Sequence, residues 1–86
     1  MDFAWDEAQR EANRSKHGIN VAETRRFDWL GARFVDDVIV AGEARHHAQG
    51  FLGDRLIFVA YTMRDDTCRI VSMRRETRRE WQAYGA

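Results

Sequence analysis

The chain contains no proline, one cysteine, one lysine and no long apolar run. Because no proline, low-complexity stretch or Gly/Ser-rich linker divides its 86 residues, we expect a single domain over residues 1–86. A membrane-spanning helix needs about 18 or more apolar residues in a row, so we expect no membrane partner. The N-terminus lacks the basic and apolar regions of a signal peptide. One cysteine cannot form an internal disulfide, which fits the reducing cytoplasm, and we expect the protein there.

The positive charge is carried almost entirely by arginine and is concentrated near the C-terminus. Arginine supplies 13 of the 14 basic residues, while the net charge of the chain is zero. A GC-rich genome is an equally good explanation of this preference over lysine, but it does not explain the clustering. Residues 67–79 hold five arginines and one acidic residue, Glu76. A local excess on a neutral chain indicates a surface directed at phosphate or carboxylate groups.

The most apolar segment, 56–61, is expected to form the central strand, because both of its faces are apolar. A polar break follows at 63–66, and 67–74 is the next strand. A connecting loop with an even number of residues would pair Tyr61 with Ile70 and place both on one face with Ser72 and Arg74. A loop with an odd number would reverse the faces. Cys68 alternates with Ile70 and is interpreted as a small buried side chain.

Capping patterns predict three helices. Asp6 is a typical N-cap for a first helix that runs to about Lys16, with two alanines, Ala8 and Ala12, facing inward and Gly18 as its stop. Asn20-x-x-Glu23 has the capping-box spacing and predicts a second helix through about 29. Thr77-x-x-Glu80 predicts a short last helix from about 78.

Further strands are expected at 2–5, 33–41 and 43–50, which gives the order β-α-α-β-β-β-β-α. The sequence therefore predicts an α+β domain in which two N-terminal helices pack on a mainly antiparallel sheet, with a short C-terminal helix at its edge. The other face of such a sheet is left for a ligand.

With these elements placed, the sequence resembles the BrnT-type toxins of bacterial type II toxin–antitoxin systems, small ribonucleases with a RelE-like fold. The resemblance spans nearly the whole chain. It rests on Phe3-x-Trp5-Asp6, Asn13-x-x-Lys16-His17-Gly18, Glu43-x-Arg45, Gly50, Arg55-Leu56, Tyr61-Thr-x-Arg64, Arg69-Ile-x-Ser72-x-Arg74, Thr77-Arg-Arg-Glu80 and Tyr84. The chain departs from the family pattern at Val21, where Phe is usual, at Asp28-Trp29, in place of Asp-Pro, and at Glu76, in place of Ala. These departures affect packing and local charge.

The resemblance implies an endoribonuclease that needs no metal and no other cofactor, and that inhibits growth until a cognate antitoxin binds it. The antitoxin would be BrnA-like and DNA-binding, so DNA would be a partner only through the toxin–antitoxin complex. In RNA the 2′-hydroxyl already lies next to the phosphate that it attacks. The alternative is a module that binds RNA or a partner without cutting, because arginine is too basic for proton transfer at neutral pH. Cleavage of RNA by the purified protein would distinguish the two.

Six residues are candidates for the catalytic site. The resemblance places Arg64, Arg74 and Arg78 together at one end of the sheet, where they would stabilise phosphate charge. Lys16 and His17 are either cations that complement the end of the first helix or groups that move protons and orient RNA. Ser72 is either a buried hydroxyl bonded to a neighbour or a substrate contact.

A further set of six residues is expected to bind RNA by charge or stacking. The set is Arg45, His47, Tyr61, Arg69, Arg75 and Tyr84. The adjacent His46 and His47 point to opposite faces if they lie on a strand, and no cysteine or carboxylate stands at zinc-ligand spacing, so we expect no metal site. The aromatic residues Trp5, Trp29, Phe27 and Phe58 are expected in the core instead.

Overall fold

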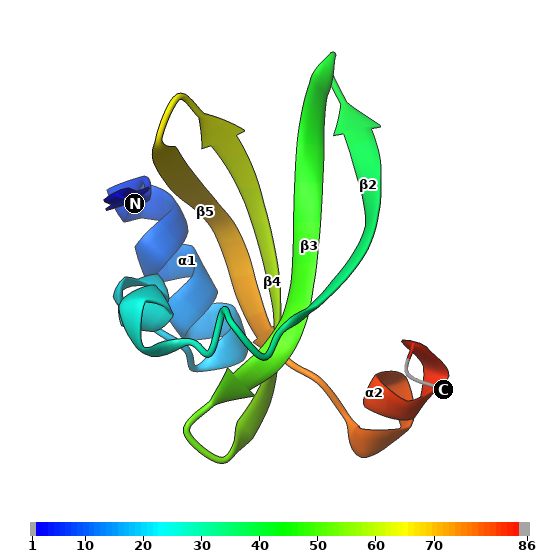
Figure 1. The fold of residues 1–86 in the computed structure, drawn as a ribbon. Helices are drawn as coiled ribbons and strands as arrows, with labels where there is room; N and C mark the ends of the chain where they lie inside the picture. The colour runs from blue at the N-terminus through cyan, green and yellow to red at the C-terminus, as the bar shows by residue number, and fades with distance from the viewer. Residues whose placement is uncertain (1, 85–86) are drawn as a thin grey trace.

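The computed structural model describes residues 2–84, and of Asp36 and Tyr84 it describes the backbone alone. The elements follow the expected order (Figure 1): β1 (Asp2–Ala4), α1 (Glu7–His17), η1 (Val21–Arg26), β2 (Arg33–Val40), β3 (Glu43–Leu52), β4 (Arg55–Arg64), β5 (Thr67–Arg75) and α2 (Arg78–Tyr84). The strands form a five-stranded sheet in the order β1-β5-β4-β3-β2. Only the β1–β5 pair is parallel, so the mainly antiparallel α+β sheet is confirmed. No helix within residues 2–84 is long and apolar enough to cross a membrane.

Helix α1 begins and ends where the sequence predicted. The Asp6 side chain accepts from the amides of Ala8 and Gln9 at 2.8 and 3.2 Å. Gly18 ends the helix in the left-handed conformation, with φ of 70°, which a residue without Cβ adopts freely. The inward face was predicted wrongly, because Ala8 and Ala12 are exposed. The buried residue of α1 is Asn13.

Asn13 makes three hydrogen bonds, two of which join α1 to β5. Its amide nitrogen donates to the carbonyls of Ile19 and Met73 at 2.8 and 3.0 Å, and its oxygen accepts from the Met73 amide at 3.0 Å. Strand β1 pairs only with Thr67–Arg69 of β5, so the edge of β5 has no strand neighbour at Met73. The carboxamide of Asn13 takes the place of that neighbour and satisfies both peptide groups of a buried residue.

The second predicted helix is a six-residue 3-10 helix, η1, rather than an α-helix reaching residue 29. The Asn20 cap is confirmed, with its side chain accepting from the Ala22 amide at 3.0 Å. Val21, Thr24 and Phe27 are all buried and stand three residues apart, the period of a 3-10 helix, which brings them onto one face. The indole of Trp29 donates to the Thr24 carbonyl at 3.0 Å, which fixes the chain after η1.

A β-bulge in β5 changes which residues share a face. The expected pair Tyr61–Ile70 forms, but the next pair is Ala60–Ser72, so Val71 is an extra residue in β5. The prediction that Ser72 and Arg74 share a face with Tyr61 is therefore wrong. Beyond the bulge, Met73 pairs with Val59 in the core, and Ser72 and Arg74 point to the opposite side of the sheet.

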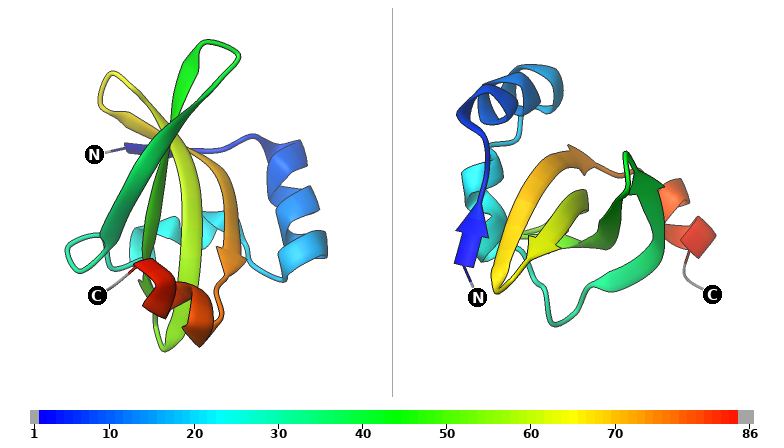
Figure 2. Two further views of the ribbon diagram at one scale, coloured as in Figure 1. Left: turned by 90° about the vertical axis from the view of Figure 1, so that its right-hand side faces the viewer. Right: turned by 90° about the horizontal axis from the view of Figure 1, so that it is seen from above.

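The two sides of the sheet differ in their cover (Figure 2). Helices α1 and η1 lie on one side, called the helix side here, and the buried core lies between them and the sheet. Cys68 belongs to this core, as predicted, and burial raises the pKa of its thiol to about 11. Helix α2 lies across one end of the other side, which we call the open face. At the opposite end of the sheet, the β2–β3 and β4–β5 hairpins diverge.

Candidate functional site

Strand pairing arranges the side chains of the open face in rows across β3, β4 and β5. The rows, starting from the α2 end, are Gln49, Phe58 and Arg74, then His47, Ala60 and Ser72, then Arg45, Thr62 and Arg69, and finally Arg64. Six of the residues singled out from the sequence therefore share this face, although they come from three strands. His46 points to the helix side, so the opposite directions of His46 and His47 are confirmed.

The end of the open face near the hairpins holds a depression of about 730 Å³. Three arginines line it, each from a different strand: Arg45 from β3, Arg64 from β4 and Arg69 from β5. Acidic side chains from the rim, Glu43 and Asp65 among them, also line the depression. Guanidinium groups are suited to phosphate, and the neighbouring acids reduce the net positive charge of the depression.

Near α2, the ring of Phe58 is contacted from both sides. The His47 imidazole stacks on it from β3, with centroids 5.2 Å apart, and the Arg74 guanidinium lies 4.8 Å from its centroid on the β5 side. Phe58, expected in the core, is thus a half-buried residue of the open face. A titratable imidazole and a permanent cation are held against one ring, which fixes their mutual arrangement.

Arg74 is also bound to α2. Its guanidinium forms an ion pair with Glu80 at 2.9 Å, and the two side chains are 39% and 37% exposed. Glu80 in turn closes the predicted capping box, in which Thr77 and Glu80 exchange hydrogen bonds of 3.1 Å. The amide of Thr77 and the guanidinium of Arg74 hold the pKa of Glu80 below its ordinary value. The start of α2 and the position of Arg74 are therefore coupled through one carboxylate.

Glu76, which the sequence suggested only as a departure from the family pattern, occupies a central position here. It is 9% exposed, and its Oε2 accepts from the Gln49 amide at 2.9 Å. Burial raises the pKa of Glu76 above its ordinary value, and the charge of Glu80 adds to this, against the opposing effects of Gln49, Arg74 and Arg33. A buried carboxyl with a raised pKa beside two arginines is typical of functional sites. The sequence signal that could have identified Glu76 is its position between an arginine-rich strand and a capped helix.

Arg33 is a second residue that sequence reasoning missed. Its guanidinium lies 3.5 Å from the centroid of Trp81 and donates to the Trp81 carbonyl at 2.8 Å. Trp81 also contacts Phe51 edge to face at 5.7 Å, so it holds α2 on the sheet together with the Arg74–Glu80 ion pair. A cavity of about 580 Å³ lies beside this contact and is lined by Glu76, Arg78 and Trp81, among others.

The arginines expected at one end of the sheet lie at two. Arg74 and Arg78 are near α2, but Arg64 is six residues along β4 from the partner of Arg74, Phe58. At about 3.3 Å per residue this is roughly 20 Å. The expected convergence of Arg64 with Arg74 is therefore wrong, because the pairing places the β4–β5 turn and the end of β5 at opposite ends of the hairpin.

Four of the predicted residues are not on the open face. Arg75 pairs with Ile57 and points to the helix side, and Tyr61 packs there against Trp29, with ring centroids 5.4 Å apart. Lys16 and His17 form the end of α1. No contact described within residues 2–84 joins either of them to the arginines of the open face. The side chain of Tyr84 lies outside the described residues.

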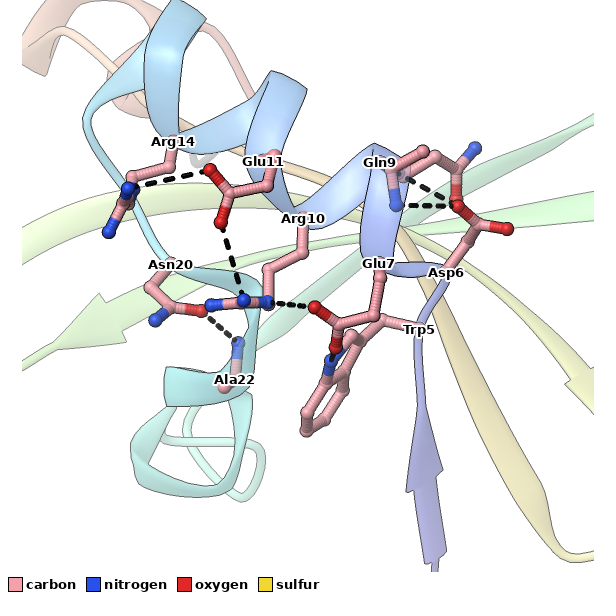
Figure 3. Close-up of polar contacts among 10 residues, drawn as sticks. Trp5, Asp6, Glu7, Gln9, Arg10, Glu11, Arg14, Asn20 and Ala22 are labelled. Carbon is pink, nitrogen blue, oxygen red and sulfur yellow. Dashed lines mark hydrogen bonds and ion pairs between the residues drawn. The ribbon is translucent and has the colours of Figure 1, made fainter.

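The exposed side of α1 is occupied by its own ion pairs (Figure 3). Arg10 binds Glu7 at 2.8 Å and Glu11 at 3.3 Å, and Arg14 contacts Glu11 at 3.4 Å. Each of these two arginines is thus paired with a carboxylate of its own helix.

Comparisons with known proteins agree on one family. The model of the family described as "Ribonuclease toxin, BrnT, of type II toxin-antitoxin system" matches residues 5–80. Among solved structures, the chain is similar to the 1.1 Å crystal structure of the Brucella abortus ribonuclease toxin BrnT. The two are 27% identical, with a TM-score of 0.71 over 91% of this chain and 99% of that chain. A search of curated proteins finds no match.

Proposed function

Because the chain belongs to the BrnT family of ribonuclease toxins of type II toxin–antitoxin systems, we propose that RNA lies across the open face and is cut beside His47 and Arg74. The family implies an RNA target and a cognate antitoxin. The open face is favoured because it gathers arginines from three strands and is covered by a helix at one end only. A polyanion is attracted to such a surface before any specific contact forms.

One observation carries the choice of the reaction centre. His47 and Arg74 both contact the ring of Phe58, so an imidazole and a guanidinium of this face lie next to the same side chain. Histidine is the residue type whose ordinary pKa lies near neutrality, which suits proton transfer. Arginine stays charged and stabilises the negative charge that develops on phosphate.

The reaction that these groups support uses a nucleophile from the RNA itself. Neutral His47 accepts the proton of a 2′-hydroxyl, whose oxygen attacks the adjacent phosphorus. The bond to the 5′-oxygen of the next nucleotide breaks, and that oxygen takes a proton from water. Arg74 and Arg78 stabilise the phosphate charge, and Ser72, one row from Phe58, contacts the substrate. Because the attacking group is already part of the substrate, the reaction proceeds without a divalent ion.

The rest of the open face positions the strand. Arg45, Arg64 and Arg69 hold phosphates away from the cut in the depression between the hairpins. Arg75, Tyr61 and Tyr84 remain predicted RNA contacts. Lys16 and His17, predicted from the sequence to move protons or orient RNA, lie at the end of α1 and take no part in the proposed step. The antitoxin is proposed to be BrnA-like and to carry the DNA-binding function of the complex.

The test is cleavage of a defined RNA by the purified protein in EDTA. We expect unchanged cleavage in EDTA, a cyclic phosphate or its 3′-phosphate hydrolysis product at the new end, and resistance of a matched RNA that carries one 2′-deoxynucleotide at the cut position. Rapid cleavage of the deoxy-substituted RNA would overturn the mechanism. Loss of activity in EDTA that added metal restores would overturn the proposed independence of metal. Tight binding of RNA without any cleavage would support the alternative, a module that binds RNA and does not cut it.

A further inference from the structure

An aromatic cavity opens on the helix side of the sheet, beyond the part that α1 and η1 cover. It has a volume of about 470 Å³ and is lined mainly by Phe3, Trp29, Phe34, Tyr61 and Met63. Four of these five side chains are aromatic, and they come from β1, β2, β4 and the loop after η1. No arginine or lysine within residues 2–84 lines this cavity. Of the residues that line it, Tyr61 alone is a predicted RNA contact, and no step of the proposed cleavage uses the cavity.

The cavity continues into an exposed apolar surface along β2. Phe34 is 62% exposed and Ile39 67% exposed, although both are large apolar residues on the helix side. Val38 and Val40, on the other side of the same strand, are exposed as well. Large apolar residues exposed beside an aromatic cavity on a small protein indicate an interaction site, because leaving them in water costs free energy.

Strand β2 also lies at the edge of the sheet, where it pairs with β3 alone. The far edge of an outer strand presents backbone N–H and C=O groups that a second chain can pair with. Peptide recognition by strand addition uses such an edge for affinity and an adjacent pocket for specificity. β2 with the aromatic cavity beside it has both features.

The chemistry of this surface selects a protein over RNA. Asp37, whose side chain is half exposed, is bonded at 2.9 Å to His46, which lines the cavity. A carboxylate beside a lining residue repels phosphate and attracts a basic side chain. The family supplies one protein partner, the antitoxin. We propose that a segment of the antitoxin lies along β2, inserts a large apolar side chain into the aromatic cavity and places a basic residue near Asp37.

This position also explains how binding on the helix side stops cleavage on the open face. β2 and its turn border both: Val40 and Ala41 line the depression that holds Arg45, Arg64 and Arg69. A partner bound along β2 therefore lies at the rim of the proposed RNA site. The part of the partner's chain beyond β2 then crosses that site. The inference rests on family membership and on this surface, and not on the catalytic roles of His47 and Arg74.

The experiment measures the affinity between the full-length toxin and the protein encoded by the reading frame next to its gene. Phe34→Asp removes the most exposed lining ring. We expect it to weaken antitoxin binding by more than about 30-fold, the loss typical of an interface hot spot. Cleavage of RNA by the free variant should be unchanged, so cells should be arrested even when the antitoxin is present. Asp37→Lys is expected to weaken binding as well.

Leu30→Asp is the matched control, because Leu30 is 102% exposed and does not line the cavity. It should bind the antitoxin like the unchanged protein. Antitoxin binding by Phe34→Asp at full strength would overturn the inference, as would equal weakening by Leu30→Asp. A toxin dimer that Phe34→Asp dissociates, with antitoxin binding intact, would assign the surface to self-association instead. If Phe34→Asp does not fold, Met63→Glu, at a partly exposed position of the lining, gives the same readout.

Discussion

Replacing Asn13 by alanine tests how α1 is held on the sheet. The change removes three hydrogen bonds of 2.8 to 3.0 Å at a side chain that is 5% exposed. At roughly 1 kcal/mol net for each bond, the loss is about 3 kcal/mol, and the peptide groups of Met73 left unpaired in the interior add to it. Total stabilities of small domains are about 5–15 kcal/mol.

The assay is thermal unfolding followed by circular dichroism. For a domain of this size, 1 kcal/mol shifts Tm by about 4–8 °C, so Asn13→Ala should lower Tm by roughly 12–24 °C. Gln9→Ala is the control on the same helix, because Gln9 is exposed and only its backbone takes part in the cap. A loss below about 1 kcal/mol for Asn13→Ala would refute the argument that this carboxamide replaces a missing strand.

The remaining predictions concern the open face. Arg74→Ala and Arg78→Ala should each abolish growth arrest. For Arg74→Ala the free energy of unfolding should fall by no more than about 1 kcal/mol, the value of a half-exposed ion pair, and Arg78→Ala, at an exposed position, should change it by about 0.5 kcal/mol or less. A folded, fully toxic variant would remove that residue from the site. The pKa of Glu76 is raised, so the folded protein binds the proton of this carboxyl more tightly than the unfolded chain does. The stabilisation from the protonated Glu76 is therefore greatest below the ordinary pKa of 4.5, and it is lost as pH rises through the raised pKa. In Glu76→Gln this part of the loss should be absent from melting curves recorded between about pH 4 and 8, whereas an unchanged pH profile would show that Glu76 titrates normally.

Local chemistry was readable from the sequence. The caps at Asp6, Asn20 and Thr77 and the stop at Gly18 involve residues within a few positions of one another, and each was confirmed. The order of the elements along the chain followed from apolar segments separated by turns. These features depend on short stretches of chain, which is why composition and spacing predict them.

Features set by tertiary packing could not be predicted from the sequence. Val71 is one extra residue in β5, and it moves Ser72 and Arg74 to the face opposite Tyr61. Asn13 is buried because the edge of β5 is uncovered at Met73, a fact about a strand 60 positions away. The site near Phe58 depends on the register of three strands, so Glu76 and Arg33 did not stand out. The period of three in Val21, Thr24 and Phe27 was a usable signal for η1.

The most direct test of the reaction centre compares two histidines on opposite sides of the sheet. The measurement is the single-turnover rate of RNA cleavage by His47→Ala and His17→Ala, both checked for folding by thermal melting. Loss of a general base typically costs about 10²–10⁴ in rate, so His47→Ala should fall by that factor while His17→Ala cuts at the rate of the unchanged protein. A folded His47→Ala that cuts at full rate, with activity lost in His17→Ala, would contradict the account and move the chemistry to the end of α1.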